Sequence, residues 1–278
     1  MATPRERAER FHDLHRSGPP LVLANAWDAA SARILEEAGA PAIATSSAAM
    51  AWALGYPDGQ RAPRDEIVAA IARICRAVRA PVSADVERGF GGSPADVGET
   101  VRAIVRAGAI GVNLEDGKAA DGRTLVAPDV LADRIRAARQ AAGAEGVPLF
   151  VNARIDTYFV PAPDPAARFK DTLARAARYV DAGADGIFVP GLADLAEIGE
   201  LVRAVPRPVN ILAWPGAPTV PALAAVGVRR VSVGCSPMQA VLGLTRRIGR
   251  ELLSAGTYDA MAGDSISVAD ANALFASR

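Results

Sequence analysis

Short apolar runs alternate along this chain with longer segments in which apolar residues recur every three or four positions. The longer segments predict amphipathic helices. The clearest is residues 64–79, where Ile67, Ile71 and Ile74 lie on one face, and residues 169–183 form another. The short runs are rich in β-branched residues, as buried strands are. We predict eight strands, at about residues 21–26, 42–47, 82–87, 111–116, 149–156, 186–191, 209–213 and 230–235.

The junction between a helical segment and the next strand repeats along the chain. In several junctions a glycine follows the helical segment and an apolar run begins after it. These glycines are Gly39, Gly108, Gly183 and Gly227. Glycine adopts the left-handed conformation just past a helix end more readily than other residues do. Asp28, Ser93 and Asp194 stand where helices should begin, and each is a residue type that caps helix N-termini.

Strands that alternate with helices over most of a 278-residue chain predict an α/β fold, here a closed (β/α)₈ barrel of the TIM type. The alternative is an open doubly wound sheet, which often carries a glycine-rich phosphate loop after its first strand. The segment NAWDAA at that position contains no glycine. No interior segment has the composition of a linker. We therefore predict one domain over residues 1–278, with a C-terminal helical extension from about residue 238.

The composition excludes several classes of protein. Lys plus Arg and Asp plus Glu both total 31, so nothing indicates a nucleic-acid or anionic-membrane partner. No apolar stretch is long enough for a membrane helix, and the first 20 residues lack the apolar region of a secretory signal. Cys75 and Cys235 are far apart and form no CxxC pair, which excludes a disulfide framework or zinc knuckle. We expect a cytoplasmic protein.

Candidate functional residues gather where the predicted strands end, which is where barrel enzymes have their active sites. Asp85 and Glu87 end the third strand, and Asn113 and Glu115 end the fourth. Because side chains alternate between the two faces of a strand, each pair shares one face. Arg154 lies in the same way near the end of the fifth strand. Further candidates at strand ends are Trp27, Ser46, Ser47, Asn152, Asp156 and Asn210, and Asp58 lies in the loop after the second strand.

Clustered carboxylates without histidine or thiolate favour a hard cation such as Mg²⁺ or Mn²⁺ over zinc. Like charges on one strand face are otherwise unfavourable. We therefore predict a divalent metal site formed by Asp85, Glu87, Glu115 and Asp58. Mg²⁺ retains several waters in proteins, so one carboxylate would bind directly and the others through water. Arg154 would offer a bidentate fork to a carboxylate or phosphonate of the substrate.

Some of these residues have a purely structural alternative. Asp116 and Asp156 could each cap the helix that follows its strand, and Arg154 could be a buried ion-pair partner. His12 and His15 precede the first strand, and we expect them on the surface. We assign no catalytic histidine.

Six stretches between about residues 22 and 236 carry further information. They read NAWDAASARILEEAG, TSSAAMAWALGYPDG, PVSADVERGFG, GVNLEDG, NARIDTY and GADGIFVPG. Together they resemble the isocitrate lyase / phosphoenolpyruvate mutase superfamily. The resemblance implies a barrel that binds Mg²⁺ and a small α-oxo or α-hydroxy carboxylate, and that stabilises an enolate after a C–C or P–C bond breaks. It also implies a homodimer or homotetramer in which the last barrel helix is exchanged between subunits.

The resemblance also implies roles for individual residues. Asp85 would bind Mg²⁺ directly, with Asp58, Glu87 and Glu115 holding it through water. The superfamily usually has aspartate where Glu87 stands, so the longer side chain would alter the water shell. The residues assigned to catalysis are Asp58, Arg154 and Lys118, and those assigned to substrate binding are Ser46, Ser47, Trp27, Asn113, Asn210 and Arg154.

The sequence departs from the superfamily after the fourth strand. Lyases for isocitrate and methylisocitrate carry a loop there with a cysteine that donates a proton, followed by Gly and His. This chain reads EDGKAADGRTLVAPD and has neither cysteine nor histidine. Phosphoenolpyruvate mutase has a lysine and an asparagine on this loop, and here Lys118 is present without the asparagine.

These features favour an Mg²⁺-dependent lyase that cleaves or decarboxylates a small α-keto or α-hydroxy carboxylate, of oxaloacetate or methylisocitrate type. One alternative is a phosphonomutase or phosphonopyruvate hydrolase that acts on a P–C bond. Another is an α-keto acid-binding protein with vestigial activity. The metal site is common to all three hypotheses, so the substrate and the bond that breaks distinguish them.

Overall fold

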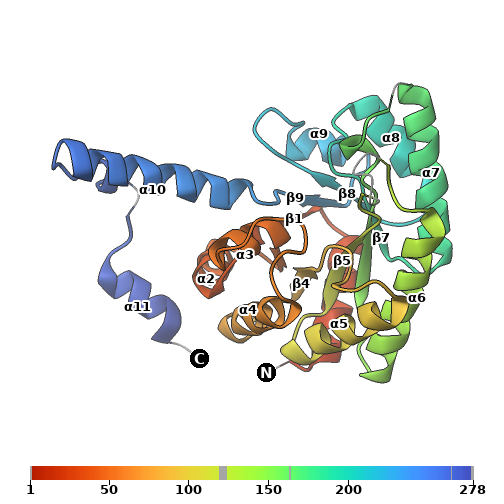
Figure 1. Cartoon of the computed structure of the whole chain (residues 1–278), viewed down its shortest axis with the longest axis horizontal. Helices are drawn as coiled ribbons and strands as arrows, with labels where there is room; N and C mark the ends of the chain where they lie inside the picture. The colour runs from red at the N-terminus through yellow and green to blue at the C-terminus, as the bar shows by residue number, and fades with distance from the viewer. Residues whose placement is uncertain (1, 119–123, 163, 264, 277–278) are drawn as a thin grey trace.

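The computed structural model describes residues 2–118, 124–162, 164–263 and 265–276. Within them, parallel strands form one nearly closed barrel that is surrounded by helices (Figure 1). The strands are β1 (Leu21–Leu23), β2 (Asn25–Ala26), β3 (Ile43–Thr45), β4 (Val82–Asp85), β5 (Gly111–Glu115), β6 (Phe150–Arg154), β7 (Gly186–Phe188), β8 (Val209–Leu212) and β9 (Arg230–Ser232). This architecture confirms the predicted TIM-type α/β barrel.

The barrel helices lie outside the strands. They are α2 (Ala29–Glu37), α3 (Ser47–Ala53), α4 (Arg64–Ala77), α5 (Pro94–Ala107), α6 (Pro128–Ala144), α7 (Pro165–Asp181), α8 (Leu195–Ala204) and α9 (Val220–Ala225). An N-terminal helix, α1 (Pro4–Arg16), precedes the barrel, and α10 (Ser236–Ser254) and α11 (Val268–Ala276) follow it. Two 3₁₀ turns are η1 (Thr157–Phe159) and η2 (Asp259–Met261).

The first predicted strand, residues 21–26, is divided in the structure. β1 pairs with β9, whereas β2 pairs with β3, so the two halves close the barrel on opposite sides of Ala24. The side chain of Asn25 bridges this gap: it donates to the carbonyl of Thr45 (2.8 Å) and accepts from the backbone N–H groups of Val233 (3.0 Å) and Gly234 (2.9 Å). A side chain thus makes the bonds across the point of closure.

The predicted helix caps agree with the structure, whereas the predicted segment 169–183 corresponds to a helix that begins earlier, at Pro165. Asp28 caps α2 through the backbone N–H of Ser31 (2.7 Å), and Ser93 and Asp194 are the N-caps of α5 and α8. Gly108 follows α5 with a φ of 106°, in the left-handed region where only glycine is unstrained. The local signals at helix ends therefore predicted the real ends.

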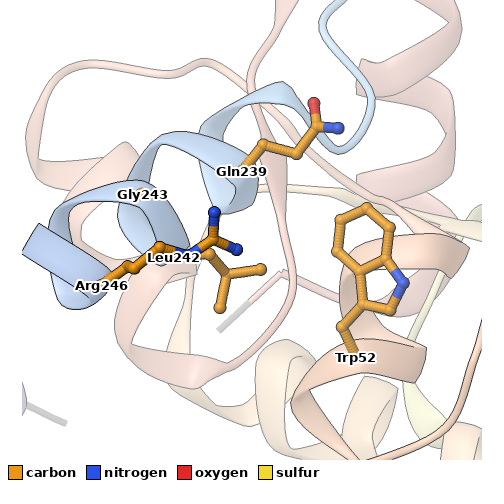
Figure 2. A pocket seen from close by; sticks show the side chains of 5 residues that line it. All are labelled: Trp52, Gln239, Leu242, Gly243 and Arg246. Atoms are coloured by element: carbon orange, nitrogen blue, oxygen red, sulfur yellow. The ribbon is translucent and has the colours of Figure 1, made fainter.

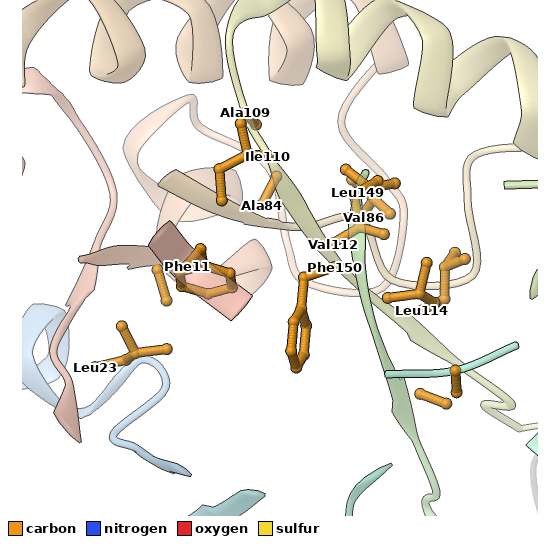
Figure 3. Packing of buried hydrophobic residues seen from close by; sticks show 14 of the residues in the cluster. Phe11, Leu23, Ala84, Val86, Ala109, Ile110, Val112, Leu114, Leu149 and Phe150 are labelled. Carbon is orange, nitrogen blue, oxygen red and sulfur yellow. The ribbon is translucent and has the colours of Figure 1, made fainter. Parts of the chain in front are cut away.

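The N-terminal helix closes the floor of the barrel, where the strands begin. Phe11 of α1 packs edge-on against Phe150, the first residue of β6, with ring centroids 5.3 Å apart (Figure 3). His15 stacks on the same ring at 4.1 Å and is 2% exposed, so its expected surface position is wrong. Burial lowers the pKa of His15 to about 3, with a further contribution from Arg230, so this imidazole is neutral at pH 7. The sequence pattern of α1 could not reveal this, because helical spacing does not say what covers a helix face.

The last two helices lie outside the barrel. In Figure 1, α10 extends away from β9, and α11 lies below it near α2. The guanidinium of Arg33 on α2 donates to the carbonyl of Leu274 on α11 (2.6 Å). Several large apolar side chains of α10 are exposed, namely Val241, Leu242, Leu244, Leu252 and Leu253. Among the described residues no helix has the length and apolar character required to cross a membrane.

Candidate active site

Two cavities differ in their chemistry. One, of about 390 Å³, lies between Trp52 on α3 and the face of α10 that carries Gln239, Leu242 and Arg246 (Figure 2). It contains no carboxylate. The other, of about 440 Å³, lies at the carboxyl ends of β4, β5 and β6. It is lined by Gly59, Glu87, Arg88, Glu115, Lys118, Arg154, Asp156 and Phe159. Its position and its charged lining make the second cavity the candidate active site.

Asp85, the last residue of β4, is buried beside this cavity. Its carboxylate accepts hydrogen bonds from the hydroxyl (2.8 Å) and the backbone N–H (3.1 Å) of Ser47. Its own N–H donates to the hydroxyl of Thr45 (2.9 Å). The hydroxyl of Ser46 caps α3 by accepting from Ala49 N–H (3.4 Å). Ser46 and Ser47, predicted to bind substrate, therefore already hold α3 and Asp85 in place.

Glu87 is buried two residues further on, in an unusual conformation. Its φ is 50°, and Gln60 (59°) and Phe90 (54°) are also left-handed. A non-glycine residue in this region costs about 1–3 kcal/mol and persists only where other contacts hold it. The side chain of Gln60 supplies such contacts, because it accepts from the N–H groups of Arg88 (2.9 Å) and Phe90 (3.2 Å). The strained backbone is concentrated on the loops beside the cavity.

The charge on Glu87 is destabilised by its surroundings. Burial raises its pKa to about 7, and the charges of Asp85 and Asp58 contribute to the rise. Asp58 itself is exposed and does not line the cavity. A bound cation would relieve this repulsion, which is the arrangement expected of metal-binding carboxylates.

Arg154 is held by two carboxylates. Its Nη1 lies 3.0 Å from Glu115, and its Nε and Nη2 donate to Asp156 at 2.6 Å and 3.1 Å. Burial alone would lower the pKa of Arg154, but the charges of Glu115 and Asp156 outweigh it and raise the pKa. Its guanidinium also lies 5.6 Å from the ring centre of Phe159. The fork that we predicted would bind substrate is occupied by Asp156, so the alternative of a buried ion pair describes its geometry.

The side chains of Asp116 and Asp156 do not cap a helix: Asp156 stands at the N-cap position of the 3₁₀ turn η1 but makes no side-chain hydrogen bond to it. Asp116 is fully buried and accepts from the N–H of Asp156 (3.0 Å), the hydroxyl of Tyr179 (3.0 Å) and Nη1 of Arg175 (3.1 Å). The same Nη1 donates to the carbonyl of Val126 (2.9 Å). Arg175 and Tyr179 are not among the candidates that the sequence predicted. Arg175 could have been noticed, because it is a charged residue on the buried face of the helix predicted at residues 169–183.

Two predicted substrate contacts lie inside the barrel, below the cavity. Asn113 accepts from Asn152 (2.9 Å) and from Arg230 (3.3 Å), and it is almost fully buried. Asn210 is fully buried and donates to the hydroxyl of Ser232 (3.3 Å). Trp27 is half-buried and does not line the cavity. Asn113 and Asn210 thus bond to neighbouring strands, and the substrate contacts of all three residues stay predictions.

Lys118 does line the cavity. It pairs with Leu125 in an antiparallel bridge, and the N–H of Val126 donates to the carbonyl of Gly117 (3.3 Å). The loop that we compared with the superfamily is therefore described at its two ends, while its residues 119–123 lie outside the described part of the chain. Arg88 and Phe159 also line the cavity, and the sequence analysis overlooked both. Arg88 was visible next to the predicted ligand Glu87.

The donor set fits a hard cation held mainly through water. In the described part of the chain no three His, Cys, Asp or Glu side chains are close enough to ligate one ion together. The charges of Asp85 and Asp58 nevertheless act on Glu87, so these three carboxylates share one region. Oxygen donors without sulfur or imidazole match Mg²⁺ or Mn²⁺.

Comparisons with known proteins agree with this geometry. The sequence model of the family described as phosphoenolpyruvate phosphomutase matches residues 11–253. The chain is 41% identical to an uncharacterized protein of Mycobacterium tuberculosis. The match covers 84% of this chain and 84% of that protein. It is 30% identical to 2-methylisocitrate lyase of Aeropyrum pernix, over 85% of this chain and 77% of that protein. A crystal structure described as a lyase or mutase of Burkholderia cenocepacia J2315 superimposes with a TM-score of 0.90 at 38% identity, covering 98% of this chain and 96% of the other.

Proposed function

The chain belongs to the isocitrate lyase / phosphoenolpyruvate mutase superfamily, and from that premise we propose that it is a metal-dependent carbon–carbon lyase. Its substrate would be a small α-keto or α-hydroxy carboxylate, of oxaloacetate or methylisocitrate type, which it cleaves or decarboxylates through an enolate. The observation that carries this proposal is the pair of buried carboxylates, Asp85 and Glu87, beside a cavity of about 440 Å³ at the carboxyl ends of the strands.

The proposed cofactor is Mg²⁺, with Mn²⁺ as a substitute. Asp85 would bind it directly, because Ser47 already orients the Asp85 carboxylate. Glu87, Glu115 and Asp58 would hold it through water. Bound there, the ion would act as a Lewis acid toward the α-oxo carboxylate of the substrate. The protein's own contribution is to keep the carboxylates oriented, as Ser47 does for Asp85 and Arg154 does for Glu115.

Arg154 is proposed to act beside the metal site. Its contacts with Glu115 and Asp156 keep it cationic and immobile, and its side chain remains 20% exposed toward the cavity. The guanidinium N–H groups of Arg154 that make no contact with Glu115 or Asp156 would face the negative charge that develops on the substrate oxygen. An immobile cation is effective there because it need not reorganise during the reaction.

Cleavage of a C–C bond is favoured over cleavage of a P–C bond. The loop after β5 lacks both the cysteine and histidine of the isocitrate lyases and the asparagine of phosphoenolpyruvate mutase. Decarboxylation of a β-keto acid needs no separate base, so it suits a site without these groups. Lys118 at the cavity is the observation that keeps phosphonate chemistry as the second candidate, since a lysine binds a phosphonate well.

The proposed activity is tested by proton NMR of the purified protein with Mg²⁺, before and after addition of EDTA. The panel contains oxaloacetate, isocitrate, methylisocitrate, oxalomalate and phosphonopyruvate. We expect one carboxylate substrate to disappear and its keto-acid product to appear, with the rate above the protein-free Mg²⁺ control and lost in EDTA. Consumption of phosphonopyruvate alone would assign the second candidate. Reversible line broadening without turnover would instead indicate an α-keto acid-binding protein.

The chain is also proposed to form a homodimer or homotetramer by exchange of α10. This helix extends away from its own barrel and exposes Leu242, Leu244 and Leu252, which a second copy would cover. We expect light scattering to give two or four times the mass of one chain, 28.8 kDa. Leu252→Lys should shift that mass toward the monomer, whereas Lys170→Gln on the exposed surface of α7 should not. A monomeric wild-type protein at micromolar concentration would contradict the proposal.

A further inference from the structure

We propose that Arg88 and Lys118 form a second anion-binding subsite in the active-site cavity, which selects substrates with a negative group at the end distal to the α-oxo or α-hydroxy carboxylate. This inference rests on the proposed function, because the proximal end of the same substrate would occupy the metal site. It adds a residue, Arg88, to which no role has been given so far.

The cations that line the cavity are not equivalent. Arg154 is neutralised by Glu115 and Asp156. In contrast, the side chains of Arg88 and Lys118 form no ion pair with any residue in the described part of the chain, although both line the same cavity. Arg154 therefore offers a ligand only the N–H groups that its two ion pairs leave over, whereas the whole side-chain head of Arg88 and of Lys118 is available.

The structure holds Arg88 in place through its backbone and its stem. Its N–H donates to the side chain of Gln60 (2.9 Å). Its methylene groups pack on Gly117: a Cβ added to that glycine would be 2.8 Å from Cδ of Arg88. Gly117 has a φ of 59° and directly precedes Lys118, so a larger residue there would both be strained and displace Arg88. The guanidinium and the lysine ammonium thus belong to neighbouring segments that are packed together.

A third cation lies near this pair. Arg134 on α6 is 7% exposed, and its Nε and Nη1 have no hydrogen-bond partner among the residues that the structure describes. Burial lowers the pKa of Arg134, and the charge of Arg88 lowers it further, because the two guanidinium groups repel each other. Unpaired like charges destabilise the free protein, and an anion bound between Arg88 and Lys118 would compensate for them.

The same cations could bind a carboxylate or a phosphonate, and matched ligands distinguish the two. Malate and 2-hydroxybutyrate differ only in a terminal carboxylate against a methyl group, and 2-hydroxy-3-phosphonopropionate carries a phosphonate instead. Oxalate chelates a metal but has no distal group. We would measure the affinity of all four by calorimetry in the presence of Mg²⁺, for the wild type, for Arg88→Gln with Lys118→Gln, and for the control Arg73→Gln with Lys170→Gln. Both control residues are exposed, and the change in charge is the same.

We expect the wild type to bind malate or the phosphonate about 10- to 100-fold more tightly than 2-hydroxybutyrate, the factor expected for hydrogen bonds to a charged group. The Arg88/Lys118 variant should lose this preference and still bind oxalate within about twofold of the wild type. The control should behave as the wild type. A preference for the phosphonate over malate would assign a phosphonate to the subsite.

Two results would overturn the subsite. If oxalate binds but the wild type does not prefer the dianions, Arg88 and Lys118 do not select a distal anion and the metal site stands. If the Arg88/Lys118 variant loses oxalate to the same extent as malate, the two residues support the metal site itself. If the wild type fails to bind oxalate with Mg²⁺, the proposed function and this subsite are both wrong. Binding of oxalate therefore distinguishes failure of the subsite alone from failure of the proposed function.

Discussion

Replacement of Asp85 with alanine is expected to reduce kcat/KM by about 10³-fold or more, because loss of a Lewis acid removes several kcal/mol of stabilisation from the transition state. Asp85 is the predicted direct metal ligand, and the hydroxyl and N–H of Ser47 already orient its carboxylate. Activity would be measured across a titration with Mg²⁺. Because the variant lacks the direct ligand, a saturating metal concentration should not restore the rate.

The fold should survive this change. Asp85 repels Glu87, so its removal should bring the pKa of Glu87 down from about 7 toward the ordinary value of a glutamate, which carbon-detected NMR can follow. Asp65→Ala is a matched control, because that aspartate is exposed in the first turn of α4. The control should retain full activity. If Asp85→Ala also retains it, Asp85 is not the metal ligand.

Replacement of Arg175 with methionine is expected to lower the free energy of unfolding by about 3–5 kcal/mol, because it leaves the carboxylate of Asp116 buried without its cation. Asp116 is fully buried, so water cannot replace the lost partner. Burial already raises its pKa to about 6 in the presence of its present partners. The same substitution removes the hydrogen bond to the carbonyl of Val126. Chemical denaturation would measure the loss, and Tm should fall by about 6–15 °C.

Arg178→Met is the matched control, one turn further along α7. Arg178 pairs with Asp129 at 2.6 Å, but both side chains are largely exposed, so its loss should cost at most about 1 kcal/mol. Equal destabilisation by the two substitutions would mean that the buried network contributes no more than a surface pair. A loss of activity in Arg175→Met at temperatures where it is folded would further indicate that Asp116 positions Asp156 and, through it, Arg154.

Local patterns in the sequence were sufficient for the barrel. The glycine after α5, the caps at Asp28 and Ser93, and the β-branched runs act over a few residues, and each has the same conformational preference in any protein. The division of the first strand at Ala24 was not predictable in this way. It results from closure of the sheet, where β1 and β2 must pair with different neighbours.

The period of a strand also predicted that Glu115 and Arg154 point to the site side of the barrel, but not that they meet. They meet because β5 and β6 are in a register that sets Glu115 beside Arg154 and Asn113 beside Asn152. That register depends on packing of the whole sheet. The sequence therefore indicated Arg154 as a substrate contact, which stays a prediction, but gave no sign of the ion pairs that Arg154 forms with Glu115 and Asp156.

The sequence by itself therefore determined the repeated βα units, the superfamily and the end of the barrel at which polar residues gather, because these depend on short-range preference and on motif. Only the tertiary structure decided which charges are neutralised: Arg154 by Glu115 and Asp156, and Asp116 by Arg175, while Arg88 and Lys118 line the cavity and form no ion pair among the described residues. Ion pairing requires side chains within about 4 Å, and residues from different strands and helices reach that distance only when the barrel has closed.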